Sequence, residues 1–138
     1  MRRQSPPEIT LCNECNILVV DDDDSNRLLL RKFLERDGHT VIEAANGVQG
    51  LKVFDALSPD IVFTDIVMPV MEGLSFVREL RNKDQRTPVI VMTSDIHGRA
   101  KEFFELSSQL GATYALEKPI TKEKLEEALN QAIEHINK

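Results

Sequence analysis

The chain has 138 residues, 41% hydrophobic and 29% charged, which suits one globular domain and excludes a disordered or fibrous chain. Seventeen lysines and arginines against twenty-three acids leave a net charge of −6, so we expect no nucleic acid partner, because few phosphates would be neutralised. The apolar runs are far shorter than the roughly 20 residues that cross a bilayer, and the N-terminus lacks the apolar core of a signal peptide. We therefore expect a cytoplasmic protein that does not enter a membrane.

The N-terminal segment differs from the rest of the chain. Residues 1–15 are polar, contain prolines and show no hydrophobic periodicity, which predicts a flexible tail before a folded domain at 16–138. Cys12 and Cys15 form a C-x-x-C pair in this tail. The pair supplies two of the four ligands that zinc needs, and it precedes the first strand, whereas a thioredoxin-like redox pair stands between a strand and a helix. We therefore expect neither a zinc site nor redox chemistry there.

The first predicted strand, at 17–20, is a continuous apolar run followed by four acids, which is typical of a strand buried on both faces of a parallel sheet. Ser25 or Asn26 is expected to cap the next helix, which ends at Gly38. The broad apolar stripe expected on this helix consists of Leu28, Leu29, Leu30, Phe33 and Leu34.

The middle of the chain repeats the alternation of a short β-branched run with a longer amphipathic stretch. A second strand at 40–44 leads through the Asn-Gly turn at 46–47 into a helix that Ser-Pro at 58–59 terminates, and a third strand follows at 61–64. The apolar positions expected on this second helix are Val48, Leu51, Val53, Phe54 and Leu57.

The second half of the chain continues the pattern. A loop through Pro69 and Gly73 precedes a third helix, and a fourth strand at 89–92, a helix at about 98–110 and a fifth strand at 114–116 come next. The apolar positions expected on the third helix are Leu74, Phe76, Val77 and Leu80.

Thr121 is expected to cap the last helix, whose apolar residues recur at helical spacing. Five strands in strict alternation with five helices predict a doubly wound α/β fold, (βα)5, with a parallel five-stranded sheet of flavodoxin-like order 2-1-3-4-5. Ligands of such sheets bind outside the carboxyl ends of the strands, where the strand order reverses. The residues directly after the first and third strands are therefore the candidates for a site.

Those residues are acids. Asp21 and Asp22 follow the first strand and Asp65 follows the third, so three carboxylates are expected at one edge of the sheet. Two unit charges about 4 Å apart repel by up to about 4 kcal/mol at an effective dielectric near 20, so such a cluster calls for a cation, and Mg²⁺ suits a small set of oxygen ligands. Asp23 and Asp24 are instead expected in the loop or at the helix start, where negative charge suits the helix dipole.

Two further polar groups are expected at the same edge. Thr93 follows the fourth strand and Lys118 the fifth, and with a divalent ion they would bind the oxygens of a phosphoryl group on Asp65. Each residue alone has an ordinary structural explanation, as a turn acid, a buried hydroxyl or a solvated lysine. Their joint placement at four strand ends favours a phosphate site.

Four motifs then resemble one family. VVDDD at 19–23, FTDIVMPVMEG at 63–73, PVIVMTS at 88–94 and LEKP at 116–119 are similar, in order and spacing, to the motifs of single-domain, chemotaxis-regulator-like response-regulator receiver domains. The resemblance covers about 16–138. It implies a receiver in a two-component or phosphorelay system, which catalyses only its own phosphorylation and dephosphorylation and is not otherwise an enzyme.

The resemblance also implies roles for individual residues. Asp65 is the phosphoacceptor nucleophile, Asp22 and Asp65 bind Mg²⁺ together with the backbone carbonyl of Val67, and Asp21 helps through water. The hydroxyl and the ammonium at the other two strand ends contact the phosphoryl oxygens. The implied donor is a histidine kinase or a histidine phosphotransfer protein, and output passes through an unidentified protein partner.

One position departs from the family pattern. Receivers commonly carry Tyr or Phe three residues before the lysine, where this chain has Ala115, and the neighbouring Tyr114 should face the other side of the sheet because strand side chains alternate. The departure leaves phosphorylation in place and puts the usual aromatic readout in doubt. It also keeps open an alternative function, a protein-binding module with a receiver fold that works independently of phosphate.

Two enzyme or cofactor classes are less suited to the sequence. A haloacid dehalogenase-type phosphatase needs a second Asp two residues after the nucleophile, where this chain has Val67. A flavodoxin needs a hydroxyl-rich phosphate loop after the first strand, and the acids at 21–24 would repel the cofactor phosphate. The receiver and the binding module therefore remain.

Overall fold

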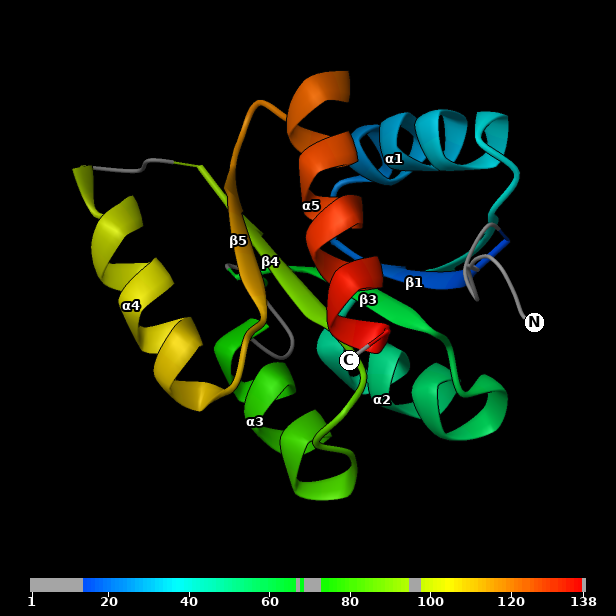
Figure 1. Cartoon of the computed structure of the whole chain (residues 1–138). Coiled ribbons are helices and arrows are strands. Elements are labelled where there is room, and N and C mark those ends of the chain that lie inside the picture. The colour runs from blue at the N-terminus through cyan, green and yellow to red at the C-terminus, as the bar shows by residue number, and fades with distance from the viewer. Residues whose placement is uncertain (1–13, 67, 69–72, 95–97, 138) are drawn as a thin grey trace.

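The computed structural model describes residues 14–66, 68, 73–94 and 98–137. Strands and helices alternate along the chain, as the sequence predicts (Figure 1). In chain order the elements are β1 (Asn16–Val20), α1 (Asp24–Arg36), β2 (Thr40–Ala44), α2 (Gly47–Leu57), β3 (Ile61–Asp65), α3 (Gly73–Lys83), β4 (Val89–Thr93), α4 (Ala100–Leu110), β5 (Tyr114–Glu117) and α5 (Lys122–Ile136).

The five strands form one parallel sheet of order β2-β1-β3-β4-β5, which confirms the predicted fold class and strand order. The register matters for function. Val20 at the end of β1 pairs with Thr64 of β3, and Thr93 at the end of β4 pairs with Glu117 of β5. The residues that follow these pairs therefore leave the sheet at one common edge, and Asp21 lies at the level of Asp65.

Helices cover both faces of the sheet, with α1 and α5 on one side and α2 and α3 on the other (Figure 1). The side chains of β1 alternate between the two resulting cores. Ile17 and Val19 pack in the core beneath α1 and α5, and Leu18 and Val20 pack in the opposite core. All four are fully buried, which confirms that the apolar run at 17–20 is a central strand.

The helices bury narrower stripes than predicted. On α1, Leu30 and Leu34 are fully buried, whereas Leu28 and Leu29 are 50% and 37% exposed. The broad stripe predicted for this helix was therefore wrong. A helix on a sheet buries positions one turn apart, such as the pair at 30 and 34, and its outer residues face solvent whatever their type. The same holds on α2, where Val48 and Leu57 are exposed and Phe54 is buried.

The start of α1 also differs from the prediction. Asp23, rather than Ser25 or Asn26, is the N-cap, and its side chain accepts hydrogen bonds from the backbone N–H groups of those two residues at 2.9 and 3.4 Å. The helix therefore begins at Asp24, whose acid lies in the first turn. The placement of Asp23 and Asp24 at the helix start was right, because a carboxylate both caps N–H groups and suits the helix dipole.

The remaining boundaries shift by a residue or two. β3, β4 and β5 each extend one residue beyond the predicted strand, so that Asp65 and Thr93 are the last residues of their strands. α4 begins at Ala100, after Gly98, whose φ of 68° is not helical. The predicted cap at Thr121 is confirmed, since its side chain accepts from the Lys124 N–H at 3.2 Å.

Cys15, assigned to the tail from the sequence, is instead fully buried. Its N–H donates to Nδ1 of His39 at 3.0 Å, and its carbonyl accepts from the N–H of Thr40 at 2.9 Å, so packing begins just before β1. Cys12 lies outside the described residues, and the flexible tail stays a prediction. Within the described ranges, no helix is long and apolar enough to cross a membrane.

Candidate functional site

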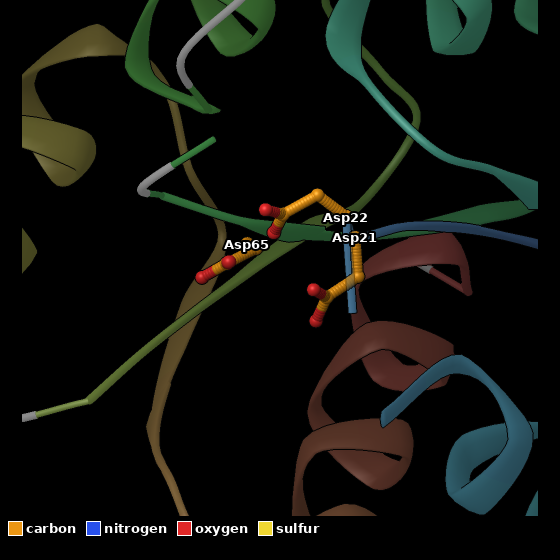
Figure 2. A group of neighbouring side chains, drawn as sticks. All are labelled: Asp21, Asp22 and Asp65. Carbon is orange, nitrogen blue, oxygen red and sulfur yellow. The ribbon is translucent and has the colours of Figure 1, made fainter. Parts of the chain in front are cut away.

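Three carboxylates meet at the carboxyl edge of the sheet, as predicted. Asp21 and Asp22 come directly after β1 and Asp65 ends the neighbouring β3, so the strand register brings them together (Figure 2). One oxygen from each lies within 4.8 Å of the other two. Asp21 is fully buried, Asp65 is 6% exposed and Asp22 is exposed. The cluster offers oxygen ligands of the kind that Mg²⁺ prefers.

Asp21 is held by protein donors on every side. Its Oδ1 accepts the N–H of Asp23 at 2.9 Å, and its Oδ2 accepts the side-chain amide of Asn26 at 2.5 Å and Nζ of Lys118 at 3.2 Å. Its backbone carbonyl accepts Nη1 of Arg27 at 2.5 Å. These bonds compensate the burial of a carboxylate, which would otherwise be costly. Both carboxylate oxygens of Asp21 are thereby engaged.

Lys118 lies between two of the acids. It follows β5, and its backbone N–H donates to the carbonyl of Thr93 at 2.8 Å. This hydrogen bond holds the backbone of Lys118 beside the end of β4. Its Nζ is 3.2 Å from Oδ2 of Asp21 and 3.6 Å from Oδ1 of Asp65. Burial lowers the pKa of Lys118, but the carboxylates of Asp65 and Asp21 outweigh it, so the pKa is raised and the side chain stays an ammonium.

The surroundings of the Asp65 carboxyl disfavour its charged form. The pKa of Asp65 is raised to about 6, first by burial and then by the charges of Asp21 and Asp22, although Lys118 lowers it. A divalent cation among these acids would favour the charged form, because an opposite charge nearby offsets both burial and repulsion. A cation at this edge would therefore relieve the unfavourable surroundings of the Asp65 carboxylate.

Thr93 reaches the same edge from β4. It is 1% exposed, and its hydroxyl donates to the carbonyl of Ser94 at 3.1 Å. The structure thus brings Asp21, Asp22, Asp65 and Lys118 into one constellation, with Thr93 at the adjacent strand end. Val67, the expected backbone ligand, lies outside the described residues.

Two structural supports of the site were not predicted from the sequence. A Cβ on Gly73 would lie 1.9 Å from the backbone oxygen of Asp65 and 2.6 Å from Cα of Ile66, so only glycine lets α3 begin against the end of β3. The Gly73 N–H also donates to the carbonyl of Ile66 at 2.7 Å. The second support is the pair Asn26 and Arg27, whose side chains fold back from the first turn of α1 onto Asp21. Neither contact follows from residue type.

Ala115 and Tyr114 of β5 face opposite sides of the sheet, as predicted. Tyr114 packs with the core beneath α1 and α5, and Ala115 packs with the opposite core, so the two side chains face opposite sides of the sheet. Tyr114 therefore does not replace the aromatic ring that the resemblance leads one to expect at the position of Ala115.

A doubly wound sheet that gathers acids and a lysine at its carboxyl edge defines the class of receiver-type α/β domains. The sequence profile described as "Response regulator receiver domain" matches residues 17–130. The chain belongs to this family, whose members are typically signalling switches in two-component systems and partners of histidine kinases or phosphotransferases.

Individual relatives agree with the family assignment. Sporulation initiation phosphotransferase F of Bacillus subtilis is 30% identical over 115 residues, which cover 83% of this chain and 90% of that protein. Sensor protein EvgS of Escherichia coli is 34% identical over 123 residues, or 89% of this chain, which spans 10% of the sensor's length. A receiver domain protein from Clostridium thermocellum superposes with a TM-score of 0.80 at 33% identity, covering 88% of this chain and 96% of that one. The chemotaxis protein CheY4 of Vibrio cholerae also gives 0.80, at 30% identity, covering 86% and 98%.

Proposed function

We propose that this chain is the phosphoacceptor receiver of a two-component or phosphorelay system, with Asp65 as the residue that carries the phosphoryl group. The observation that supports the proposal is the environment of Asp65. It is a nearly buried carboxylate at a strand end, with two further acids within metal-binding reach and the ammonium of Lys118 at 3.6 Å. A buried acid in such surroundings is a candidate nucleophile, and a lysine beside it suits an anionic group.

In the proposed reaction an Asp65 oxygen attacks the phosphorus of a phosphohistidine. A P–O bond forms to the carboxylate while the P–N bond breaks, and its electron pair stays on the imidazole nitrogen of the donor. Lys118 neutralises charge on the equatorial phosphoryl oxygens, and the Thr93 hydroxyl binds one of them after leaving the Ser94 carbonyl. The donor is a histidine kinase or a histidine phosphotransfer protein.

The residues present fit Mg²⁺ as the cofactor. Asp22 and Asp65 offer carboxylate oxygens, Val67 is proposed to add its backbone carbonyl, and Asp21 is proposed to act through water because its own oxygens already accept protein donors. Bound at this edge, the ion would neutralise the acids and draw phosphoryl oxygens toward Asp65.

The test is intact mass after incubation with Mg²⁺ and acetyl phosphate. Wild type should gain one phosphoryl group, and Asp65→Asn should gain none. Chelation of Mg²⁺ should abolish the adduct in wild type. Glu126→Gln, which removes an exposed acid on α5, is the matched control and should be labelled like wild type. An unlabelled wild type, or an adduct that persists in Asp65→Asn, contradicts the proposal.

The alternative is a protein-binding module that works independently of phosphate. The observation that favours it is Ala115, which leaves the sheet face at β5 without the family's aromatic side chain. The two functions differ in one measurement, the affinity for a partner protein with and without phosphate on Asp65. The switch requires a difference, since a ligand shifts a two-state equilibrium only through its differential affinity, whereas the module requires none.

A further inference from the structure

We infer that Asn26 is a positioning residue of this site, whose side-chain amide holds Asp21 so that Lys118 is available to the phosphoryl group. The inference rests on the proposed function and deepens it. Among the described contacts, the Asn26 side chain bonds to Asp21 and not to Asp65 or Lys118. It acts through Asp21, which in turn competes with Asp65 for the ammonium of Lys118.

The contact geometry on Asp21 carries the argument. Its Oδ2 has two side-chain donors, the Asn26 amide at 2.5 Å and Nζ of Lys118 at 3.2 Å. A charged carboxylate can only accept, so the amide nitrogen of Asn26, rather than its oxygen, must face Asp21. Because Asp21 is fully buried, each donor it loses leaves part of a buried charge without compensation.

Lys118 is shared between two carboxylates. Its Nζ stands 3.2 Å from Asp21 and 3.6 Å from Asp65, so a phosphoryl group on Asp65 would draw the ammonium away from Asp21. With Asn26 in place, Oδ2 of Asp21 keeps a donor when Lys118 moves. Without Asn26, Lys118 is the side-chain donor that remains to Oδ2 among the described contacts. The departure of Lys118 would then leave the buried charge of Asp21 without compensation at this oxygen. Asn26 therefore lowers the free-energy cost of moving the Lys118 ammonium from Asp21 to the phosphoryl group on Asp65.

The first turn of α1 is built to hold this contact. The Asn26 N–H is 3.4 Å from the capping carboxylate of Asp23, which fixes its backbone. The next residue, Arg27, donates to the backbone carbonyl of Asp21 at 2.5 Å and is anchored by Glu43 at 2.8 Å. One helical turn thus holds both the side chain and the main chain of Asp21.

Two substitutions separate a donor role from a purely structural one. Asn26→Asp keeps the shape of the side chain, and an acid in the first turn of a helix is stabilising, so a structural role predicts that it is tolerated. A donor role predicts the opposite, because the new carboxylate repels Asp21. Asn26→Leu removes the donor without adding charge, and it remains informative if the aspartate variant fails to fold. Asn130→Asp, at an exposed position on α5, is the matched control.

The experiment measures the rate of labelling by acetyl phosphate at saturating Mg²⁺, by intact mass, over a range of donor concentrations. Asn26→Leu should lower the maximal rate by about tenfold to a hundredfold, the range expected for one hydrogen bond to a charged group, and leave the half-saturating donor concentration unchanged. Asn26→Asp should be slower still, and Asn130→Asp should match wild type.

The outcomes are distinguishable. If wild type is never labelled, the proposed function fails and the role of Asn26 fails with it. If wild type is labelled and Asn26→Leu reacts at the same rate, only the role of Asn26 is overturned. If Asn26→Leu is slow but Asn26→Asp is as fast as wild type, the side chain serves packing, and the donor role is also overturned.

Discussion

Replacing Asp65 with asparagine should stabilise the metal-free protein near neutral pH. The pKa of Asp65 is raised from 3.8 to about 6, first by burial and then by Asp21 and Asp22. In the folded state this carboxyl therefore keeps its proton to a higher pH than in the unfolded chain. At about 1.4 kcal/mol for each pH unit, the difference corresponds to about 3 kcal/mol.

The sign follows from proton binding. Between pH 3.8 and about 6 the folded protein binds more protons than the unfolded chain, so its free energy of unfolding falls as the pH rises through this window. Above it the full penalty is present. Asparagine does not ionise, so Asp65→Asn should gain up to about 3 kcal/mol over wild type at pH 8, and the gain should shrink toward pH 4.

The assay is urea unfolding followed by circular dichroism, in a chelator, at several pH values between 4 and 8. Added Mg²⁺ should cancel the advantage of the variant, because binding at 100 times its Kd stabilises wild type by about 3 kcal/mol, and the variant lacks a ligand. Glu126→Gln is the control and should show no such pH-dependent gain. A difference between Asp65→Asn and wild type that is the same at pH 4 and pH 8 would refute the electrostatic reasoning.

Three further predictions concern the scaffold. Burial lowers the pKa of His39, so wild type should lose stability as the pH falls below 6.5, where the unfolded chain takes up the proton first. His39→Leu should remove this pH dependence, and it should cost about 1 kcal/mol of stability at pH 8 because a hydrogen-bond acceptor is lost. Urea unfolding across the pH range measures both effects. Gly73→Ala should destabilise the domain by about 2 kcal/mol or more and slow labelling of Asp65, because its Cβ would collide with the backbone of that residue at 1.9 Å; unchanged labelling and stability would show that α3 can move freely. Leu30→Ala should cost about 2 to 5 kcal/mol, whereas the exposed Leu28→Ala should cost roughly 0.5 kcal/mol or less, and thermal unfolding of the two variants side by side checks this assignment of the inner face of α1.

The sequence was informative wherever local pattern and chemistry agree. The apolar run before Asp21 is typical of a buried strand, and repeated alternation with amphipathic stretches predicted a parallel doubly wound sheet. In that topology strand ends share an edge, so the convergence of Asp21, Asp22, Asp65 and Lys118 was predictable without coordinates. The structure confirms each of these placements.

Tertiary structure alone decided the contacts that depend on distance rather than on period. Hydrophobic periodicity marks a helix face but not its width, which is why the predicted apolar stripe of α1 includes Leu28 although this residue is exposed. Asn26 is a plausible cap by residue type, and only the path of the chain after β1 turns its amide onto Asp21. Likewise, the sequence predicts that Gly73 is a loop residue, whereas in the structure it begins α3 against the backbone of Asp65. The sequence by itself determined which groups meet at the edge of the sheet. The packing of α1 and α3 against that edge determined how they are held, because hydrogen-bond partners and close approaches are set by the docking of whole elements.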